Sequence, residues 1–366
     1  MRTRAREMLL ILLGLVLILS EPLGAGELKT NRAKALVPLS EIVPGGPPPD
    51  GIPAVDKPKF VTPKEADVWL NPKEPVLAVV VNGEARAYPL QILTWHEIVN
   101  DIVGGRPVSV TYCPLCNSGI VFDRRVEERL LDFGTSGMLY KSDLVMYDRQ
   151  THSLWSQMEG RAIVGDLAGT KLSWLPSNTM AYGEWKGLFP AGKVLSRETG
   201  HRRQYGWNPY ASYDELTSHP FLFFDQVDRR LPPKERVVGI VIGNEAKAYP
   251  FGLLATRRVL TDTFNGQPLV VFYRPGTLSA LDQALISQSR EVGATAVFSP
   301  VLDGKTLTFE VTETGFKDRE TGSLWSLLGR AYQGPLAGKA LRPLIHVDAF
   351  WFAWAAFQPK TLIYQP

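Results

Sequence analysis

The chain has 366 residues, a length typical of about two domains. Its hydrophobic content of 45% and charged content of 21% are those of a folded globular protein and exclude a largely disordered chain. The formal net charge of +3 is too small to predict binding to nucleic acid or to an anionic membrane.

The first 26 residues have the pattern of a secretory signal peptide. Three arginines among the first six residues precede an apolar run over residues 8–19, and small residues follow at 24–26. This run is short for a membrane span and typical of a signal peptide. We therefore expect export to the periplasm or the extracellular space, and no membrane span in the mature chain. An uncleaved N-terminal anchor is the alternative.

Residues 27–75 follow as a proline-rich segment, with VPGGPPPDGIP at 43–53. This composition favours extended backbone and turns and supplies little core material. We expect this segment to be an extended arm on the surface of the first domain.

A first structural unit is expected over residues 76–200. The β-branched run 76–81, the Asn82-Gly83 pair and the alternating run 84–90 predict a hairpin. Apolar spacing predicts a helix over 93–103, ended by two glycines. The further elements that we expect are strands at 107–112, 119–124, 130–133, 144–147 and 154–157 and a helix at 180–188.

The hairpin motif occurs a second time. VLAVVVNGEARAYPL at 76–90 and VVGIVIGNEAKAYPF at 237–251 agree at 7 of 15 positions. DRQTHSLW at 148–155 and DRETGSLW at 318–325 agree at 6 of 8. We therefore expect two degenerate repeats, 76–200 and 237–366, joined by a connector at 201–236.

Many short strands and few helices predict an α+β fold in which each repeat is mainly antiparallel sheet.

The repeats differ at the residues that could carry chemistry. Tyr112-Cys113-Pro114-Leu115-Cys116 in the first copy aligns with Tyr273-Arg274-Pro275-Gly276-Thr277 in the second, so both thiols are absent from the second copy. His96 aligns with Arg257. The sequence therefore indicates that any chemistry resides in the first repeat.

Cys113 and Cys116 are the only cysteines of the chain. Two thiols three residues apart around a proline have the form of a metal-binding turn, and a disulfide closing so short a loop would stabilise the fold little. With His96 as a third ligand, the donor set predicts a soft metal, copper slightly ahead of zinc. Ser136, Asp148 and Arg149 are then candidates for the rim of the site or its outer shell.

Other interpretations stay open. The Cys-x-x-Cys spacing also allows a thiol–disulfide redox protein, although a strand rather than a helix is expected after the turn, unlike in thioredoxins. Asp148, Arg149 and Trp155 recur in the second copy, which favours a structural role for them. A third hypothesis is a non-catalytic module with a peptide- or glycan-binding groove, which predicts Trp174, Trp185 and Trp207 together on an open face. No further partner is predicted.

Several segments resemble the bacterial domain-of-unknown-function family 3179. They are HEIVND at 96–101, YCPLC at 112–116, SDLVMYDR at 142–149, SLW at 153–155 and AIVG at 162–165. The resemblance is strong over residues 60–200 and weaker over the second repeat, and it implies little about activity. Family members commonly have glycine where this chain has Asn117, and asparagine tolerates a positive φ, so the same turn is expected.

Overall fold

The computed structural model describes residues 27–365 of the chain. The predicted signal peptide, residues 1–26, lies outside the described residues. Between residues 27 and 365, no helix is long and apolar enough to cross a membrane.

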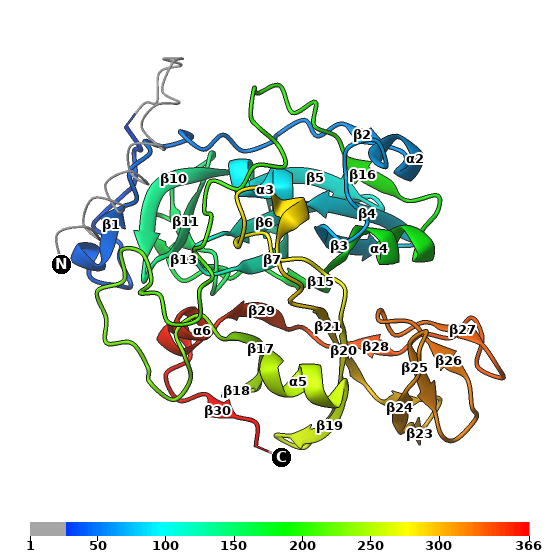
Figure 1. Ribbon diagram of the computed structural model, residues 1–366. Coiled ribbons are helices and arrows are strands. Elements are labelled where there is room, and N and C mark those ends of the chain that lie inside the picture. The colour runs from blue at the N-terminus through cyan, green and yellow to red at the C-terminus, as the bar shows by residue number, and fades with distance from the viewer. Residues whose placement is uncertain (1–26, 366) are drawn as a thin grey trace.

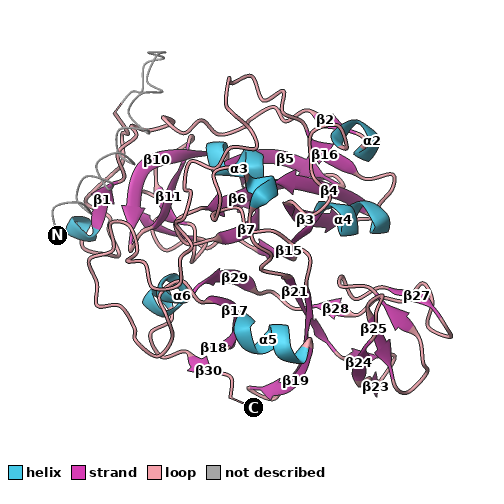
Figure 2. Cartoon of the chain, in the orientation of Figure 1, coloured by secondary structure: helices cyan, strands magenta, loops and turns pink. Residues whose placement is uncertain are grey.

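Antiparallel sheets form most of the described chain, and the helices are short (Figure 2). This confirms the α+β class. The helices are η1 (Leu39–Glu41), α2 (Pro63–Ala66), α3 (Leu90–His96), α4 (Tyr182–Leu188), α5 (Phe251–Arg257), η2 (Ile286–Gln288) and α6 (Trp351–Phe357).

The first half of the chain forms three sheets and a small hairpin (Figure 1). The first sheet has the order β15 (Ser177–Ala181), β3 (Pro75–Val81), β4 (Glu84–Pro89), β16 (Lys193–Leu195), β2 (Phe60–Val61). The second has the order β14 (Trp174–Leu175), β7 (Ser118–Asp123), β6 (Arg106–Cys113), β5 (Ile98–Val103). The third has the order β1 (Ile42–Pro44), β10 (Phe133–Tyr140), β11 (Asp143–Asp148), β12 (Leu154–Ser156), β13 (Arg161–Val164). The hairpin is β8 (Arg125–Val126) with β9 (Arg129–Leu130).

The second half also forms three sheets and a small hairpin. The first sheet has the order β29 (Val347–Phe350), β17 (Arg236–Ile242), β18 (Glu245–Pro250), β30 (Leu362–Ile363). The second has the order β19 (Val259–Phe264), β20 (Gln267–Arg274), β21 (Ala294–Ser299), β28 (Arg342–Pro343). The third has the order β24 (Phe309–Val311), β25 (Phe316–Asp318), β26 (Leu324–Trp325), β27 (Ala331–Gln333). The hairpin is β22 (Val301–Leu302) with β23 (Lys305–Thr306).

The strands pair in the same order in both halves. The series β15-β3-β4-β16 corresponds to β29-β17-β18-β30, and in each series the last pair is parallel. The series β14-β7-β6-β5 corresponds to β28-β21-β20-β19. The pairing order is therefore shared by the two halves, and their description as two degenerate repeats stays a prediction.

The two halves contact each other through two pairs of neighbouring strands. β29 of the second half lies beside β7 of the first, and β15 of the first lies beside β21 of the second (Figure 1). At the first of these contacts, the backbone N–H of Phe350 donates to the carbonyl of Cys116 at 2.9 Å. The second half therefore packs directly against the cysteine turn.

The predicted hairpin at residues 76–90 is confirmed. β3 and β4 pair in antiparallel register, and the turn residues Asn82 and Gly83 have φ angles of 48° and 84°. Two consecutive positive φ angles define the turn that suits the twist of a two-residue hairpin, and Asn-Gly is the pair that adopts it most readily.

The predicted helix at residues 93–103 is wrong. α3 ends at His96, Glu97 has a left-handed φ of 58°, and the chain continues as β5. Four of the six residues of β5 are isoleucine or valine, whose branched side chains favour strands. Pairing with β6 satisfies the backbone of this segment and overrides its helical spacing.

An identical buried motif occurs in both halves at the repeated DR-x-T-x-SLW sequence. Asp148 accepts hydrogen bonds from the indole of Trp155 at 2.9 Å and from the backbone of Thr151 at 2.6 Å. Asp318 accepts the same two bonds, from Trp325 at 2.8 Å and from Thr321 at 2.6 Å. Each aspartate therefore ties a turn to a core tryptophan. These shared contacts favour a structural role for Asp148.

We expect Asp148→Ala and Asp318→Ala each to lower the free energy of unfolding by roughly 2–4 kcal/mol, because each leaves buried donors without an acceptor. The effects should add in the double variant, since the two motifs share no partner. Urea unfolding followed by tryptophan fluorescence measures both quantities. Asp166→Ala, at an exposed ion pair, is the control and should change stability by less than about 0.5 kcal/mol. A change at Asp148 no larger than at Asp166 would contradict the structural role.

Candidate functional site

The two cysteines lie on a tight turn between β6 and β7. Cys113 is the last residue of β6, and its backbone pairs with Ser118 at the start of β7. Asn117, between Cys116 and β7, has a φ of 52°, as the sequence predicts for a turn that commonly contains glycine. Ladder pairing on both sides therefore holds the two thiols on the same turn.

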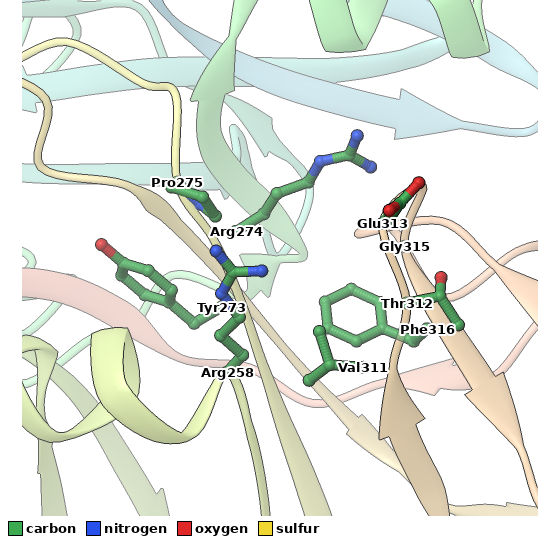
Figure 3. Close-up of a pocket in the computed structure, with 9 residues that line it drawn as sticks. All are labelled: Arg258, Tyr273, Arg274, Pro275, Val311, Thr312, Glu313, Gly315 and Phe316. Atoms are coloured by element: carbon green, nitrogen blue, oxygen red, sulfur yellow. The ribbon is translucent and has the colours of Figure 1, made fainter.

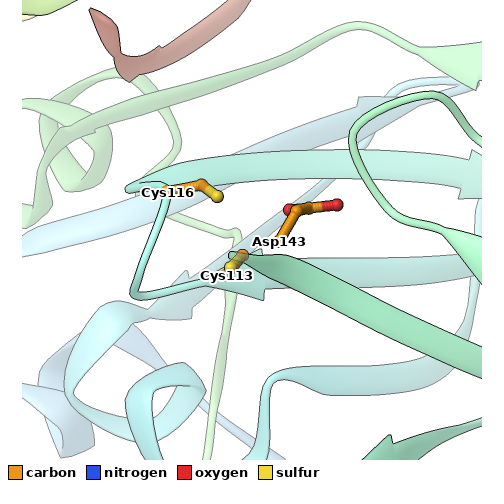
Figure 4. A group of neighbouring side chains, drawn as sticks. All are labelled: Cys113, Cys116 and Asp143. Atoms are coloured by element: carbon orange, nitrogen blue, oxygen red, sulfur yellow. The ribbon is translucent and has the colours of Figure 1, made fainter. Parts of the chain in front are cut away.

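Asp143 brings a third donor to this turn. It is the first residue of β11, in the neighbouring sheet. Its carboxylate and the sulfur atoms of Cys113 and Cys116 all lie within 4.8 Å of one another (Figure 4). All three side chains are at most 1% exposed. We call these residues the thiol–carboxylate group.

The hydrogen bonding of Asp143 is incomplete. Its Oδ2 accepts the backbone N–H of Met158 at 2.9 Å, whereas its buried Oδ1 has no partner among the described residues. Burial raises the pKa of Asp143 to about 7. A buried oxygen without a donor is uncommon and costs folding free energy, which marks this atom as one that a ligand could satisfy.

Both thiols are held in their neutral form. Burial raises the pKa of Cys113 and raises that of Cys116 well above the usual thiol value. The sulfur of Cys116 lies 3.6 Å from the carbonyl of Ser142, a distance at which its S–H donates weakly. Redox-active cysteines need the opposite environment, one that stabilises the thiolate. This electrostatic setting disfavours the thiol–disulfide hypothesis.

Glu97 is a second buried acid beside the group. It closes α3 in a left-handed conformation, and its carbonyl accepts the N–H of Tyr112 at 2.8 Å, one residue before Cys113. Burial, followed by the charge of Asp143, raises the pKa of Glu97 to about 8. The site thus contains two thiols and two carboxyl groups that are all stabilised in their neutral forms.

Lys234 lies near this group inside a cage of aromatic rings. Its ammonium nitrogen is 3.1 Å from the ring centre of Tyr213, 4.8 Å from that of Phe350 and 5.0 Å from that of Phe352. It has no hydrogen-bond partner within residues 27–365. The rings favour the charged amine, but burial opposes them and lowers the pKa of Lys234 to about 6.

His96, the third ligand predicted from the sequence, lies outside the thiol–carboxylate group. Its Nδ1 is 2.7 Å from the carbonyl of Pro53, and its Nε2 is 2.6 Å from the hydroxyl of Tyr205. Burial lowers the pKa of His96 to about 4. The neutral ring therefore donates to Pro53 and accepts from Tyr205, so both nitrogens are engaged. Metal binding by His96 would require the bond from Tyr205 to break.

The other predicted site residues also have partners within the fold. Ser136 donates to the carbonyl of Val145 at 2.5 Å, where the register of β10 and β11 shifts. Arg149 pairs with Asp50 at 2.7 Å and with Asp56 at 3.3 Å, which tethers the proline-rich segment to the third sheet. A role for Ser136, Asp148 and Arg149 at the rim of the site stays a prediction.

The open tryptophan face required by the binding-module hypothesis does not form. Trp185 is fully buried in the core, and Trp174 packs edge-on against Phe122 with ring centres 5.6 Å apart. Of the three tryptophans, only Trp207 is exposed, at 51%.

Sequence comparison of the repeats did not identify Asp143 and Glu97. The repeat offset aligns Asp143 with Glu313, so this carboxylate is retained and does not stand out. Glu97 aligns with Arg258, a charge reversal next to the aligned His96 and Arg257. This change of charge between the repeats is the sequence feature that could have marked Glu97 as a candidate site residue.

We expect the stability difference between the wild type and Lys234→Met to depend on pH. Between about pH 6 and 10.5 only the unfolded chain binds the lysine proton, so wild-type stability rises with pH in this window. Relative to the variant, the slope should reach about 1.4 kcal/mol per pH unit. Urea unfolding of both proteins at several pH values measures it. A difference that is constant with pH would show that the aromatic cage keeps Lys234 charged in the folded state.

The comparisons with known proteins concern nearly the whole chain. The sequence profile of a family described as "Protein of unknown function (DUF3179)" matches residues 49–361, which include both halves and the thiol–carboxylate group. No curated protein and no solved structure shows significant similarity to the chain. The chain therefore belongs to the DUF3179 family, whose function is unknown.

Proposed function

We propose that the protein binds one transition metal ion through Cys113, Cys116 and Asp143. The proposal rests on three buried donor groups, two thiols and one carboxylate, whose donor atoms lie within 4.8 Å of one another. One oxygen of that carboxylate, Oδ1 of Asp143, has no hydrogen-bond partner among the described residues. A metal ion would deprotonate both thiols and balance the carboxylate, which removes the cost of burying these polar groups.

The donor set favours zinc. Two thiolates suit zinc or copper(I) and disfavour magnesium and calcium. With histidine as the third ligand, the sequence placed copper slightly ahead. A carboxylate oxygen in place of the imidazole is a harder donor, and zinc accepts sulfur and carboxylate ligands together. We therefore rank zinc first and copper second.

Three protein ligands leave a fourth position on a tetrahedral ion, as in catalytic zinc sites. Glu97 is a further buried acid close enough to Asp143 for the charge of Asp143 to contribute to its raised pKa. It would serve either as the fourth ligand or as the group that takes a proton from bound water. The first role gives a closed storage or structural site, and the second gives a site capable of hydrolysis.

The connector covers the site and would control entry of the ion. Ser142, next to Asp143, donates to the carbonyl of Phe221 at 2.5 Å. The backbone N–H of Phe221 in turn donates to the hydroxyl of Tyr213 at 3.2 Å. This segment has little regular secondary structure. Loading of the metal would therefore accompany folding or local opening of residues 201–236. Export to the periplasm or extracellular space is part of the proposal and rests on the N-terminal sequence.

Metal analysis tests the proposed ligands. The purified mature protein should contain about one zinc or copper ion per chain by mass spectrometry. Cys113→Ser, Cys116→Ser and Asp143→Asn should each weaken metal binding by at least about 100-fold. Loss of a residue that only supports a ligand already weakens metal binding by up to about 100-fold, and loss of a ligand itself should cost at least as much. His96→Gln distinguishes the two donor sets, because it should retain the metal if Asp143 is the third ligand.

Asp166→Asn, at an exposed aspartate, is the matched control and should retain full metal content. Circular dichroism of each variant separates loss of the metal from loss of the fold. A wild-type protein that stays metal-free after incubation with zinc and with copper(I) would overturn the proposal.

Thiol reactivity separates metal binding from redox activity. In the chelator-treated native protein at pH 7, both cysteines should react with iodoacetamide at least about tenfold more slowly than in the urea-unfolded chain, because burial raises both pKa values. Mass spectrometry of the quenched reaction measures the rates. Rapid labelling of one thiol in the native state would instead support a thiol–disulfide function.

A further inference from the structure

The second half contains the same local backbone arrangement as the one beside the thiol–carboxylate group: a helix that ends in a residue with positive φ, whose carbonyl accepts the N–H of a tyrosine. We call this arrangement the backbone cradle. Arg258 closes α5 with φ 61° and ψ −31°, and Glu97 closes α3 with φ 58° and ψ −29°. The N–H of Tyr273 donates to the carbonyl of Arg258 at 2.8 Å, as that of Tyr112 does to Glu97. The left-handed residue and the strand that follows it therefore have the same local geometry in both halves.

The side chains in this cradle differ from those of the first half. Arg274 occupies the position of Cys113 at the end of β20, and Arg258 occupies that of Glu97. Glu313 aligns with Asp143. The equivalent positions therefore carry a thiol and a carboxyl group in the first half, and two guanidinium groups in the second.

These side chains surround an open cavity of about 250 Å³ (Figure 3). Its lining includes Arg258, Arg274 and Glu313 together with the apolar side chains of Val311 and Phe316. The volume lies just below the usual range for small-molecule pockets, so its ligand is small.

The two arginines are not equivalent. Arg274 pairs with Glu184 at 3.2 Å and donates to the carbonyl of Thr314 at 2.9 Å. Arg258 has no ion-pair partner among residues 27–365, and Figure 3 shows its guanidinium between the rings of Tyr273 and Phe316. Arg258 is therefore the group available to bind an anion, and a guanidinium binds the two oxygens of a carboxylate side by side.

The remaining lining restricts the anion further. Glu313 has no ion-pair partner in the part of the chain that the structure describes, and it would repel a second negative charge. Val311, which is 38% exposed, offers apolar surface next to Arg258, whereas the ring of Phe316 is 2% exposed and stacks on Phe272. A ligand with one negative charge and an apolar body suits this lining better than a phosphate or a dicarboxylate.

We propose that the cavity of the second half binds a small organic monocarboxylate, with its carboxylate on Arg258 and its apolar part against Val311. The cradle that holds thiols in the first half would thus serve as a separate ligand site in the second. This proposal does not depend on metal binding.

Ligand titration of the full mature protein tests it, with benzoate as the monocarboxylate probe and inorganic phosphate and succinate as comparators. Benzoate should bind with a Kd on the order of 1 mM by calorimetry or ligand-observed NMR, and the two comparators at least about tenfold more weakly. Arg258→Gln should weaken benzoate binding at least about tenfold. Arg257→Gln changes the exposed neighbour outside the pocket lining and should change the Kd by less than about twofold.

Val311→Ser, at a residue that is 38% exposed, should weaken the binding of benzoate without strengthening the binding of phosphate. The chelator-treated wild-type protein should bind benzoate as the untreated protein does, which separates this site from the metal proposal. Three results would each overturn the inference: no benzoate binding up to about 20 mM, equal losses in the Arg257 and Arg258 variants, or tighter binding of phosphate than of benzoate.

Discussion

Burial of the cysteine turn is the constraint on which the candidate site depends. The turn belongs to a hairpin of the first half, but the strand that covers it, β29, belongs to the second, and Phe350 donates a backbone hydrogen bond to Cys116. The connector adds Tyr213 and Lys234 on the same side. Because water is excluded, the thiols and carboxyl groups are all shifted toward neutral forms. An isolated first half would leave this turn exposed and lose that electrostatic environment.

The polar groups of the site reduce the stability of the fold. A buried carboxylate oxygen without a donor and a caged lysine without a hydrogen bond each cost free energy that apolar side chains would not. The core around them is otherwise well formed, with large aromatic residues fully buried in both halves. Such unfavourable groups concentrated at one place are typical of a functional site, and a metal ion is the ligand that would satisfy the thiols and the carboxylate together.

The two halves show how one backbone arrangement supports different chemistry. The helix that ends in a left-handed residue, the strand after it and the neighbouring sheet position side chains at equivalent points in each half. Where those points carry cysteine, aspartate and glutamate, the group is closed and buried. Where they carry arginines, longer charged side chains leave an open cavity at the surface. The buried aspartate–tryptophan motifs, which are identical in both halves, support the sheet next to each site.

Features governed by neighbours in the sequence could be predicted from the sequence alone. The Asn82-Gly83 hairpin, the positive φ of Asn117 and the mainly antiparallel α+β class follow from local backbone preferences and apolar alternation. The cysteine pair stood out because its spacing and its absence from the second copy are visible in the sequence. The position of Asp143 beside the thiols was decided by tertiary structure, since Asp143 reaches them only when β11 packs against the cysteine hairpin. The contact between His96 and Tyr205 of the connector was decided in the same way. The strand at 98–103 was decided in the same way, because its partner strand supplies hydrogen bonds that residue spacing does not reveal.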